Sequence, residues 1–442
     1  PDERTVALLR RERRELSRAL RLLRLRGLVA GAVLAVAGAL TALPALRFEG
    51  RPLEERLEAY SPWLAGVLVP DPLDSRILLA SVTERTQQAR GRGFDDPPSL
   101  AAWRRDHAAV LDALSRGGAR VVVFTQFFES ATAGDSALAG AIRRAETRGT
   151  RVVLGFRDLE DGRPRLVPGI RDAAGAWGAL CMVTRPVPTG WVIPLVIFPD
   201  GGSDPSTAVS SLAAAAVTAY HGDHLARLEP SRRRLVYAGA GGERSLAYGH
   251  VEPGTNSEGC SALGPDGVAF EGILNSSPRR AFAGTRHRLA YEALLGRNAG
   301  REAERARGRI VLVGRDNPAN TFPVTTIPVL SRGKEHRYAG ELQADAINSV
   351  LRGTLLRPLS TLVQFLVTAG LGAAAAAAAL HGRARRRRGR GLLLLGGIVA
   401  GYLASAALVM VWAHVLLNVW FHLLAIVVSF VVARVIRRRY AL

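Results

Sequence analysis

The chain has 442 residues, of which 48% are hydrophobic, and a formal net charge of +21. A chain this basic could bind nucleic acid or anionic lipid, and the positions of the basic residues distinguish the two. Residues 1–26 hold nine arginines against four acidic residues, residues 381–390 hold six arginines and the tail from Arg434 holds four, which together carry +15. Because these segments flank apolar ones and do not coat a domain, the pattern argues against nucleic acid and favours a membrane protein.

Four apolar segments are long enough to cross a bilayer as helices. Residues 27–46 and 359–380 each form one predicted span, and residues 391–436 are too long for one, so we expect a hairpin with spans at 391–411 and 414–436. The first segment follows an arginine-rich stretch, as a cleaved signal peptide does. It lacks a small-residue cleavage site, and we therefore predict an uncleaved anchor.

The distribution of arginines predicts how these spans are oriented. By the positive-inside rule, residues 1–26, 381–390 and 437–442 lie on the cytoplasmic side, which leaves 47–358 outside as one extracytoplasmic block. We expect a multi-pass membrane protein whose main block is extracytoplasmic. The basic amphipathic stretch within 1–26 either lies on anionic lipid, pairs with a partner helix or is a solvated extension of the first span.

A polar stripe is predicted in the last span. His414, Asn418 and His422 recur every four residues, which places them near one face of a continuous helix. Two readings remain open for this stripe: a haem or quinone site, or hydrogen bonding between neighbouring helices. Because no other predicted span contains a histidine to act as a facing ligand, we favour the second reading and expect no cofactor.

The outer block alternates predicted strands and helices. Strands are predicted at 76–82, 120–124, 151–155, 234–237 and 309–314, and helices at 100–116, 135–148, 210–220, 287–295 and 340–352. The glycine-, proline- and serine-rich regions 156–205 and 239–285 are predicted to be long loops. This order predicts an α/β domain with a mostly parallel sheet and flanking helices.

Catalytic and metal motifs give little signal. The sequence contains no nucleophile elbow and no phosphate-binding loop, and His221 and His224 lack a third ligand nearby. We therefore expect no enzyme activity, no catalytic residue and no metal. Cys181 and Cys260 are the only cysteines, and either a disulfide or two free thiols fits the sequence.

Ligand-binding residues are predicted where strands end. In open α/β sheets, ligands bind at the carboxyl ends of the strands. The loop after the predicted strand 309–314 contributes Arg315, Asp316, Asn320 and Thr321, and the loops after the strands at 76–82 and 120–124 contribute Thr83, Glu84, Thr125 and Gln126. An ordinary polar loop is the alternative reading of residues 315–321.

The ordered motifs resemble those of the type-two CHASE domain. The resemblance rests on Trp103-Arg104-Arg105, the segment GGARVVVF at 117–124, the segment GRIVLVG at 308–314, and Gly340 and Ala344 in the last predicted helix of the block. One span before the block and three after it also fit that family. The chain departs from the family pattern at Thr83-Glu84 and Thr125, where acidic residues are usual, and at Gln343, where histidine is usual.

The resemblance implies an extracytoplasmic sensory domain of a bacterial membrane receptor. Such receptors continue into a cytoplasmic cyclase or kinase, which we do not expect here, so a sensory protein would act through other membrane proteins or a cytoplasmic output protein. The alternative is a structural scaffold subunit of a larger membrane complex. Membrane lipid is an expected partner in both cases, and a homodimer is one expected form of the sensor.

Overall fold

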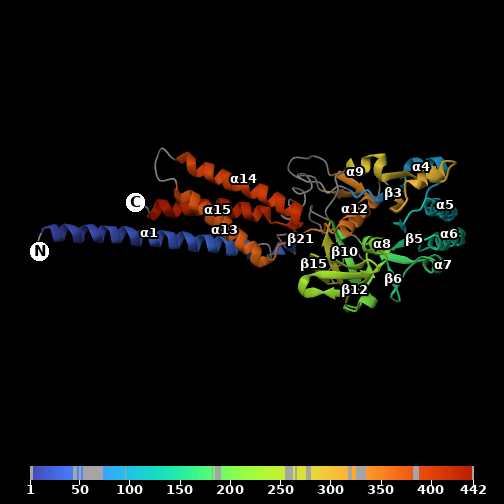
Figure 1. Ribbon diagram of the computed structural model, residues 1–442, viewed down its shortest axis with the longest axis horizontal. Helices are drawn as coiled ribbons and strands as arrows, with labels where there is room; N and C mark the ends of the chain where they lie inside the picture. Colours follow the sequence, from blue (N-terminus) through green and yellow to red (C-terminus); the bar gives the residue numbers. More distant parts are fainter. Residues whose placement is uncertain are drawn as a thin grey trace. The chain divides into compact units, whose positions relative to one another are not determined.

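A computed structural model describes most of the chain. The described residues are 3–42, 47–48, 51–52, 73–94, 96–181, 183–184, 191–253, 262–263, 266–274, 280–316, 321–324, 335–381 and 388–440. Two compact units divide the chain (Figure 1). The helical unit comprises Pro1–Ser61 and Pro358–Leu442, and the sheet unit comprises Pro62–Arg357.

Long apolar helices make up the helical unit. They are α1 (Glu3–Ala42), α13 (Thr361–His381), α14 (Arg388–Ala413) and α15 (Val419–Tyr440). Each contains a segment long and apolar enough to cross a membrane. Helix α13 packs against both α1 and α15. Gly372 allows this approach, because a Cβ there would lie 2.8 Å from Ser429 Oγ and 3.1 Å from Val33 Cγ1.

The prediction of one polar stripe in the last span was wrong. Helix α14 ends at Ala413 and α15 begins at Val419, so His414 and Asn418 lie in the connection between two helices. His414 has a φ of 52°, which breaks the helical path. Only His422 lies within α15, where it is buried and its Nδ1 is hydrogen-bonded to Tyr402 Oη of α14 at 2.6 Å.

A six-stranded parallel sheet forms the centre of the sheet unit. Its strand order is β17 (Arg288–Ala290), β3 (Ile77–Val82), β18 (Ile310–Arg315), β4 (Val121–Phe124), β5 (Arg151–Phe156) and β8 (Ala176–Ala179). Every neighbouring pair is parallel. Central strands such as β4 are apolar throughout because both faces of the sheet are covered. The predicted fold class is therefore confirmed: the chain has four helices apolar enough to cross a membrane and an α/β unit with a parallel sheet.

Helices cover both faces of this sheet. On one face lie α5 (Pro97–Arg116), α6 (Asp135–Thr147), α10 (Tyr291–Leu294) and α11 (Ala299–Glu304), and on the other lie α8 (Leu212–His221) and α12 (Ala339–Arg352). Strand side chains alternate between the two cores. Val122 and Phe124 belong to the core under α5 and α6, whereas Val121 and Val123 belong to the core under α8 and α12.

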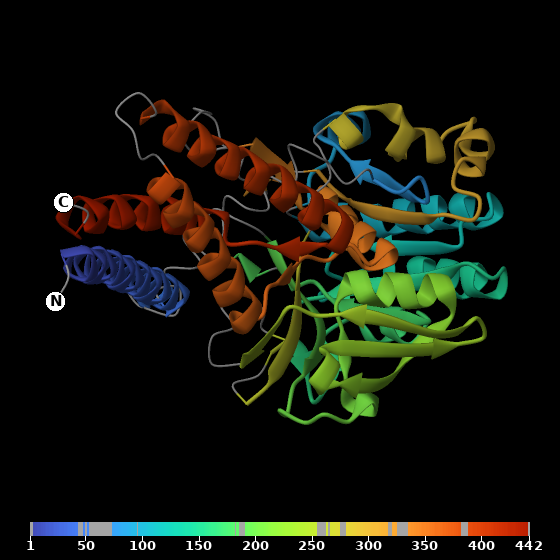
Figure 2. The same cartoon turned by 60° about the vertical axis from the view of Figure 1, so that its left-hand side comes forward.

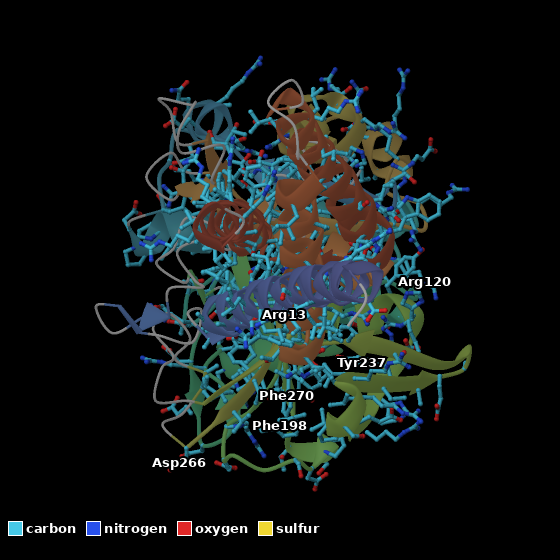
Figure 3. All side chains as sticks on the ribbon, turned by 90° about the vertical axis from the view of Figure 1, so that its left-hand side faces the viewer. Arg13, Arg120, Phe198, Tyr237, Asp266 and Phe270 are labelled. Carbon is cyan, nitrogen blue, oxygen red and sulfur yellow. The ribbon has the colours of Figure 1, made fainter. Side chains whose placement is uncertain are left out.

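The two regions predicted to be long loops in fact hold strands. A second, antiparallel sheet has the order β11 (Val209–Ser210), β10 (Trp191–Phe198), β16 (Val268–Ile273) and β15 (His250–Pro253), and β9 (Val183–Thr184) also pairs with β10. Strand β10 contains Pro194, which a strand tolerates only at an edge or bulge, and the pairing with β16 shifts register at this point. Phe198 and Phe270 pack edge to face across the sheet with ring centroids 5.6 Å apart (Figure 3).

Shorter elements complete the sheet unit. They are β6 (Leu159–Glu160), β7 (Arg163–Pro164), β12 (Asp223–Glu229), β13 (Arg234–Gly239), β14 (Gly242–Ala247), β19 (Thr321–Val324), β20 (Glu335–Tyr338), α4 (Glu84–Arg90), α7 (Pro168–Arg171) and α9 (Arg280–Ala283). Figure 2 shows α8 alongside the three-stranded sheet β12-β13-β14. The helix predicted at 287–295 is instead strand β17 followed by the single turn α10.

The cysteines give a partial answer to the disulfide question. Cys181 is buried and disulfide-bonded. Cys260 lies outside the described residues, so its pairing with Cys181 stays a prediction.

Candidate functional site

The structure brings three of the predicted ligand loops together at the carboxyl edge of the parallel sheet. Strand β18 lies between β3 and β4. The backbone N–H of Asp316 donates to Val82 O at 3.0 Å, and that of Thr125 donates to Val313 O at 2.9 Å. The three strands therefore end at the same level, and the residues after them are neighbours, as the rule for open α/β sheets predicts.

Thr83 stabilises the start of α4. It is the N-cap of α4, and its Oγ1 accepts a hydrogen bond from the N–H of Thr86 at 3.2 Å. The hydroxyl of Thr86 in turn donates to the carboxylate of Glu292. Glu84 is exposed in the first turn of α4. Of this predicted pair, Glu84 is the side chain available to an incoming ligand.

A buried ion cluster joins the edge of the sheet to α12. Arg288 of β17 donates from Nη1 to Asp316 Oδ2 at 2.6 Å and from Nη2 to Glu341 Oε1 at 2.5 Å. Asp316 and Glu341 are both buried. Burial alone would lower the pKa of Arg288, but the two carboxylates outweigh it and raise that pKa. Sequence reasoning found Asp316 and missed both its cation, Arg288, and Glu341, which shares that cation.

Several buried polar atoms at this edge have no hydrogen-bond partner among the described residues. They are Gln126 Nε2, Asp316 Oδ1 and Arg315 Nε. The Arg315 guanidinium lies over the ring of Phe94, 4.4 Å from its centroid, and this contact fixes its position. Buried polar groups are normally paired, so unpaired atoms on neighbouring loops favour the edge as a place where a polar ligand binds.

Of the remaining predicted residues, Thr321 lies next to the start of α12. Thr321 pairs with Tyr338 in the hairpin of β19 and β20, and Tyr338 immediately precedes α12. The N–H of Tyr338 donates to Glu341 Oε2 at 3.3 Å, which connects this hairpin to the ion cluster. Asn320 lies outside the described residues, and its predicted role stays a prediction.

His107 packs under the edge in an aromatic cluster that sequence reasoning did not identify. Its Nδ1 is hydrogen-bonded to Tyr291 Oη at 2.7 Å, and its ring lies edge-on to Phe124 and Phe128. Burial lowers the pKa of His107 to about 4, so the imidazole is neutral at physiological pH. A neutral, caged imidazole is typical of a core residue and not of a general base.

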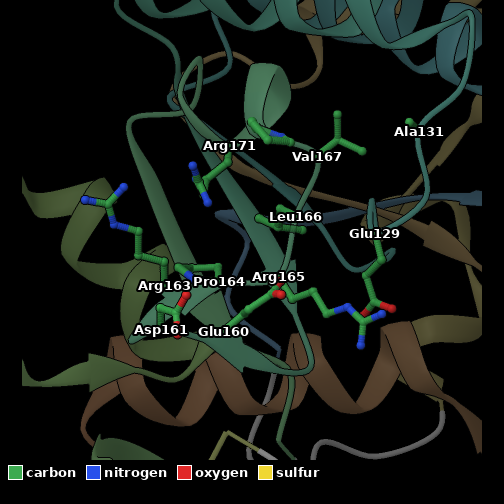
Figure 4. Close-up of a pocket in the computed structure, with 11 residues that line it drawn as sticks. Glu129, Ala131, Glu160, Asp161, Arg163, Pro164, Arg165, Leu166, Val167 and Arg171 are labelled. Carbon is green, nitrogen blue, oxygen red and sulfur yellow. The ribbon is translucent and has the colours of Figure 1, made fainter.

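A pocket of about 670 Å³ continues the edge towards β5. Its walls are the loop after β4, the β6–β7 hairpin and α7, and its charged residues are Glu129, Glu160, Asp161, Arg163, Arg165 and Arg171 (Figure 4). The N–H of Val167 donates to Phe128 O at 2.8 Å and joins two of these walls. Gln126 and Glu129 belong to the same loop after β4, so the pocket adjoins the β4 end of the edge.

The sequence did carry a signal for this pocket. Asp161 and Gly162 have φ values of 50° and 71°, the positive angles that a tight hairpin turn requires, and Asp-Gly is the sequence typical of that turn. The prediction of a long loop at 156–205 obscured this hairpin.

The described residues contain no group of three or more histidine, cysteine, aspartate or glutamate side chains placed to hold a metal ion. Comparison with protein families then identifies the fold. A model of the CHASE2 domain matches residues 31–382. The chain belongs to the CHASE2 family. CHASE2 domains are extracytoplasmic sensory domains and not catalytic ones, as the sequence resemblance implied. Neither a comparison with curated proteins nor one with solved structures gives a match.

Proposed function

We propose that this CHASE2 protein is a non-catalytic membrane sensor. A small polar ligand binds at the carboxyl edge of the sheet, and the change passes through α12 to the membrane helices and from them to a protein partner. The sheet unit faces the outside of a bacterial inner membrane, with the arginine-rich segments in the cytoplasm. The charge pattern supports this orientation through the positive-inside rule.

The observation that carries the proposal is the position of Arg288. Its guanidinium is hydrogen-bonded at once to Asp316, at the end of β18, and to Glu341, in the first turn of α12. A ligand that competes for Asp316 therefore changes the hydrogen bonding that holds α12. Arg288 would then have two alternative arrangements, one bonded to Asp316 and one not, and a two-state switch requires such a pair of states.

Helix α12 is well placed to pass on such a change. Arg337 of β20 forms a buried ion pair with Asp345, and Asn348 Oδ1 accepts a hydrogen bond from the N–H of Asp74 at 3.0 Å. The helix ends at Arg352, and eight residues separate it from Thr361, where α13 begins. A rigid helix held by polar contacts transmits a shift to the chain that follows it.

The test is affinity purification of the full chain from its native membrane in mild detergent, followed by quantitative mass spectrometry of co-purified proteins. Arg288→Met is compared with the wild type, and Arg234→Met, which changes an exposed arginine of β13, is the matched control. A sensor predicts a partner whose recovery changes in Arg288→Met and not in the control. A partner held at equal stoichiometry in all three proteins would favour the scaffold alternative. Recovery of the chain alone or as a homodimer would contradict the scaffold alternative.

A further inference from the structure

A second pocket lies at the opposite, amino-terminal edge of the parallel sheet. It has a volume of about 530 Å³ and is walled by the turns before β4, β5 and β18 and by the end of α8. Four of its eleven lining residues are arginines, namely Arg120, Arg148, Arg151 and Arg307, and none is acidic. This composition distinguishes it from the pocket at the carboxyl edge, where acidic and basic residues are mixed.

Glycine turns shape the pocket wall. Gly118 and Gly149 have φ values of 82° and 83°, which residues with a side chain rarely adopt. The side chain of Arg307 lies over Gly118, because a Cβ there would be 3.4 Å from Arg307 Cγ. The glycine therefore lets this arginine lie close against the backbone.

Two of the four arginines are held in place by carboxylates outside the pocket. Arg148 Nη1 donates to Asp112 Oδ1, and Arg151 Nη1 to Glu146 Oε2, each at 3.0 Å. Arg144 shares Asp112 with Arg148. Three guanidinium groups thus face two carboxylates, and the pairing fixes their positions without cancelling their charge.

The other two arginines have no acidic partner among the described residues. The Arg120 guanidinium lies over the ring of Tyr220, 4.8 Å from its centroid, which orients the side chain at the surface (Figure 3). Arg120 and Arg307 are both exposed. With these two included, the group around the pocket carries three positive charges in excess of its two carboxylates.

We propose that this pocket binds a small, multiply charged oxyanion of the phosphate type. A guanidinium presents a planar fork of N–H donors that matches the oxygens of phosphate, and charge-assisted hydrogen bonds of this kind are stronger than neutral ones. The concave wall suits a compact anion. Since the pocket and the proposed sensing region lie at opposite edges of the sheet, the pocket is a separate, second site.

The experiment uses the full chain in nanodiscs of phosphatidylcholine, titrated with pyrophosphate at low ionic strength by isothermal titration calorimetry. The double variant Arg120→Gln, Arg307→Gln is compared with Arg234→Gln as the matched control. Loss of two charge-assisted contacts is expected to weaken binding by at least about tenfold, and the control is expected to bind like the wild type. Both variants are checked for the wild-type melting temperature. Absence of pyrophosphate binding by the wild type, or equal binding by the double variant, would overturn the proposal.

Two further arms locate the anion and its source. Arg165→Gln removes an arginine of the carboxyl-edge pocket, so a loss of binding in this variant would place the anion there and reject the amino-edge site. Nanodiscs containing phosphatidylglycerol then test whether a lipid headgroup supplies the same phosphate chemistry. A lower apparent affinity for pyrophosphate in anionic than in neutral nanodiscs, after correction for ionic strength, would identify the lipid as the occupant. An unchanged affinity identifies a soluble anion.

Discussion

Arg288 donates a hydrogen bond over 2.6 Å to Asp316, which lies 28 residues further along the chain. The same guanidinium reaches Glu341 at 2.5 Å. One side chain therefore holds together the first residue after β18 and the first turn of α12. The two carboxylates share a single cation, so the cluster depends on Arg288 more than on either acid.

Replacing Arg288 by methionine is expected to destabilise the fold by about 2–3 kcal/mol, because it leaves two buried carboxylates without their cation. Arg288→Lys is expected to give an intermediate loss, since a single ammonium cannot reproduce the two-pronged contact. Chemical unfolding of the purified chain, followed by tryptophan fluorescence, measures the change. A stability of Arg288→Met equal to that of the control Arg234→Met would show that the cluster contributes nothing.

His107 predicts a pH dependence of stability. Its pKa is about 4 in the folded protein, below the usual value of 6.5. Between pH 6.5 and pH 4, His107 is protonated in the unfolded chain and neutral in the folded chain. Acidification through this range therefore favours unfolding. The contribution of His107 is fully present above pH 6.5 and falls by about 3 kcal/mol as the pH drops to about 4.

The variant His107→Phe is expected to flatten this part of the pH profile. It also leaves Tyr291 Oη without its partner, so the readout is the slope of unfolding free energy against pH and not the absolute stability. His224→Gln, at an exposed position of β12, is the matched control and should keep the wild-type slope. If His107→Phe and the wild type lost stability equally between pH 6.5 and 4, the imidazole would not be responsible.

The core of the fold could be predicted because parallel strands buried on both faces are apolar without interruption. Runs such as those of β4 and β18 are short, rich in valine and bounded by glycine, which identified them as central strands. The meeting of Thr125 and Asp316 at one edge follows from the same rule, since all parallel strands end on the same side. That they are neighbours depends in addition on β18 lying next to β4, and the sequence did not predict this strand order.

The features that the sequence did not predict depend on contacts between residues that are far apart in the chain. The antiparallel sheet was mistaken for loops because Pro194 interrupts β10 and Gly272 interrupts β16, and only their pairing makes them strands. Arg288 and Glu341 carry no local signal of contact, since they lie 53 residues apart. The prediction of one polar stripe was wrong because nothing in the spacing of His414 and His422 revealed that α14 ends at Ala413 and α15 begins only at Val419.

Membrane topology follows from the proposed orientation and is tested with single cysteines. Ser203→Cys, in an exposed loop of the sheet unit, is expected to react with a thiol reagent that cannot cross membranes when it is added to intact cells. Ala384→Cys, in the arginine-rich connection after α13, is expected to react only after the membrane is opened. Wild-type protein, treated in the same way, measures the background labelling. Labelling of Ala384→Cys from outside would contradict the four-span orientation.

Gly314 and Thr125 give a test of how closely β18 and β4 approach at the candidate site. A Cβ at Gly314 would overlap the Oγ1 of Thr125, whose hydroxyl donates to Val313 O at 3.4 Å. Gly314→Ala alone is therefore expected to cost about 1–3 kcal/mol, the range for overpacking a tight site.

Thr125→Ala removes the overlapping atom and, because its hydrogen bond is long, should cost about 1 kcal/mol or less on its own. The double variant is then expected to be more stable than the sum of the two single losses predicts, by about 1 kcal/mol or more, which is the sign of direct contact in a double-mutant cycle. Denaturant unfolding of all four proteins gives the coupling energy. Strict additivity would mean that the backbones of β18 and β4 are further apart at this edge than the structure places them. The residues that follow these strands would then be too far apart to form one ligand site.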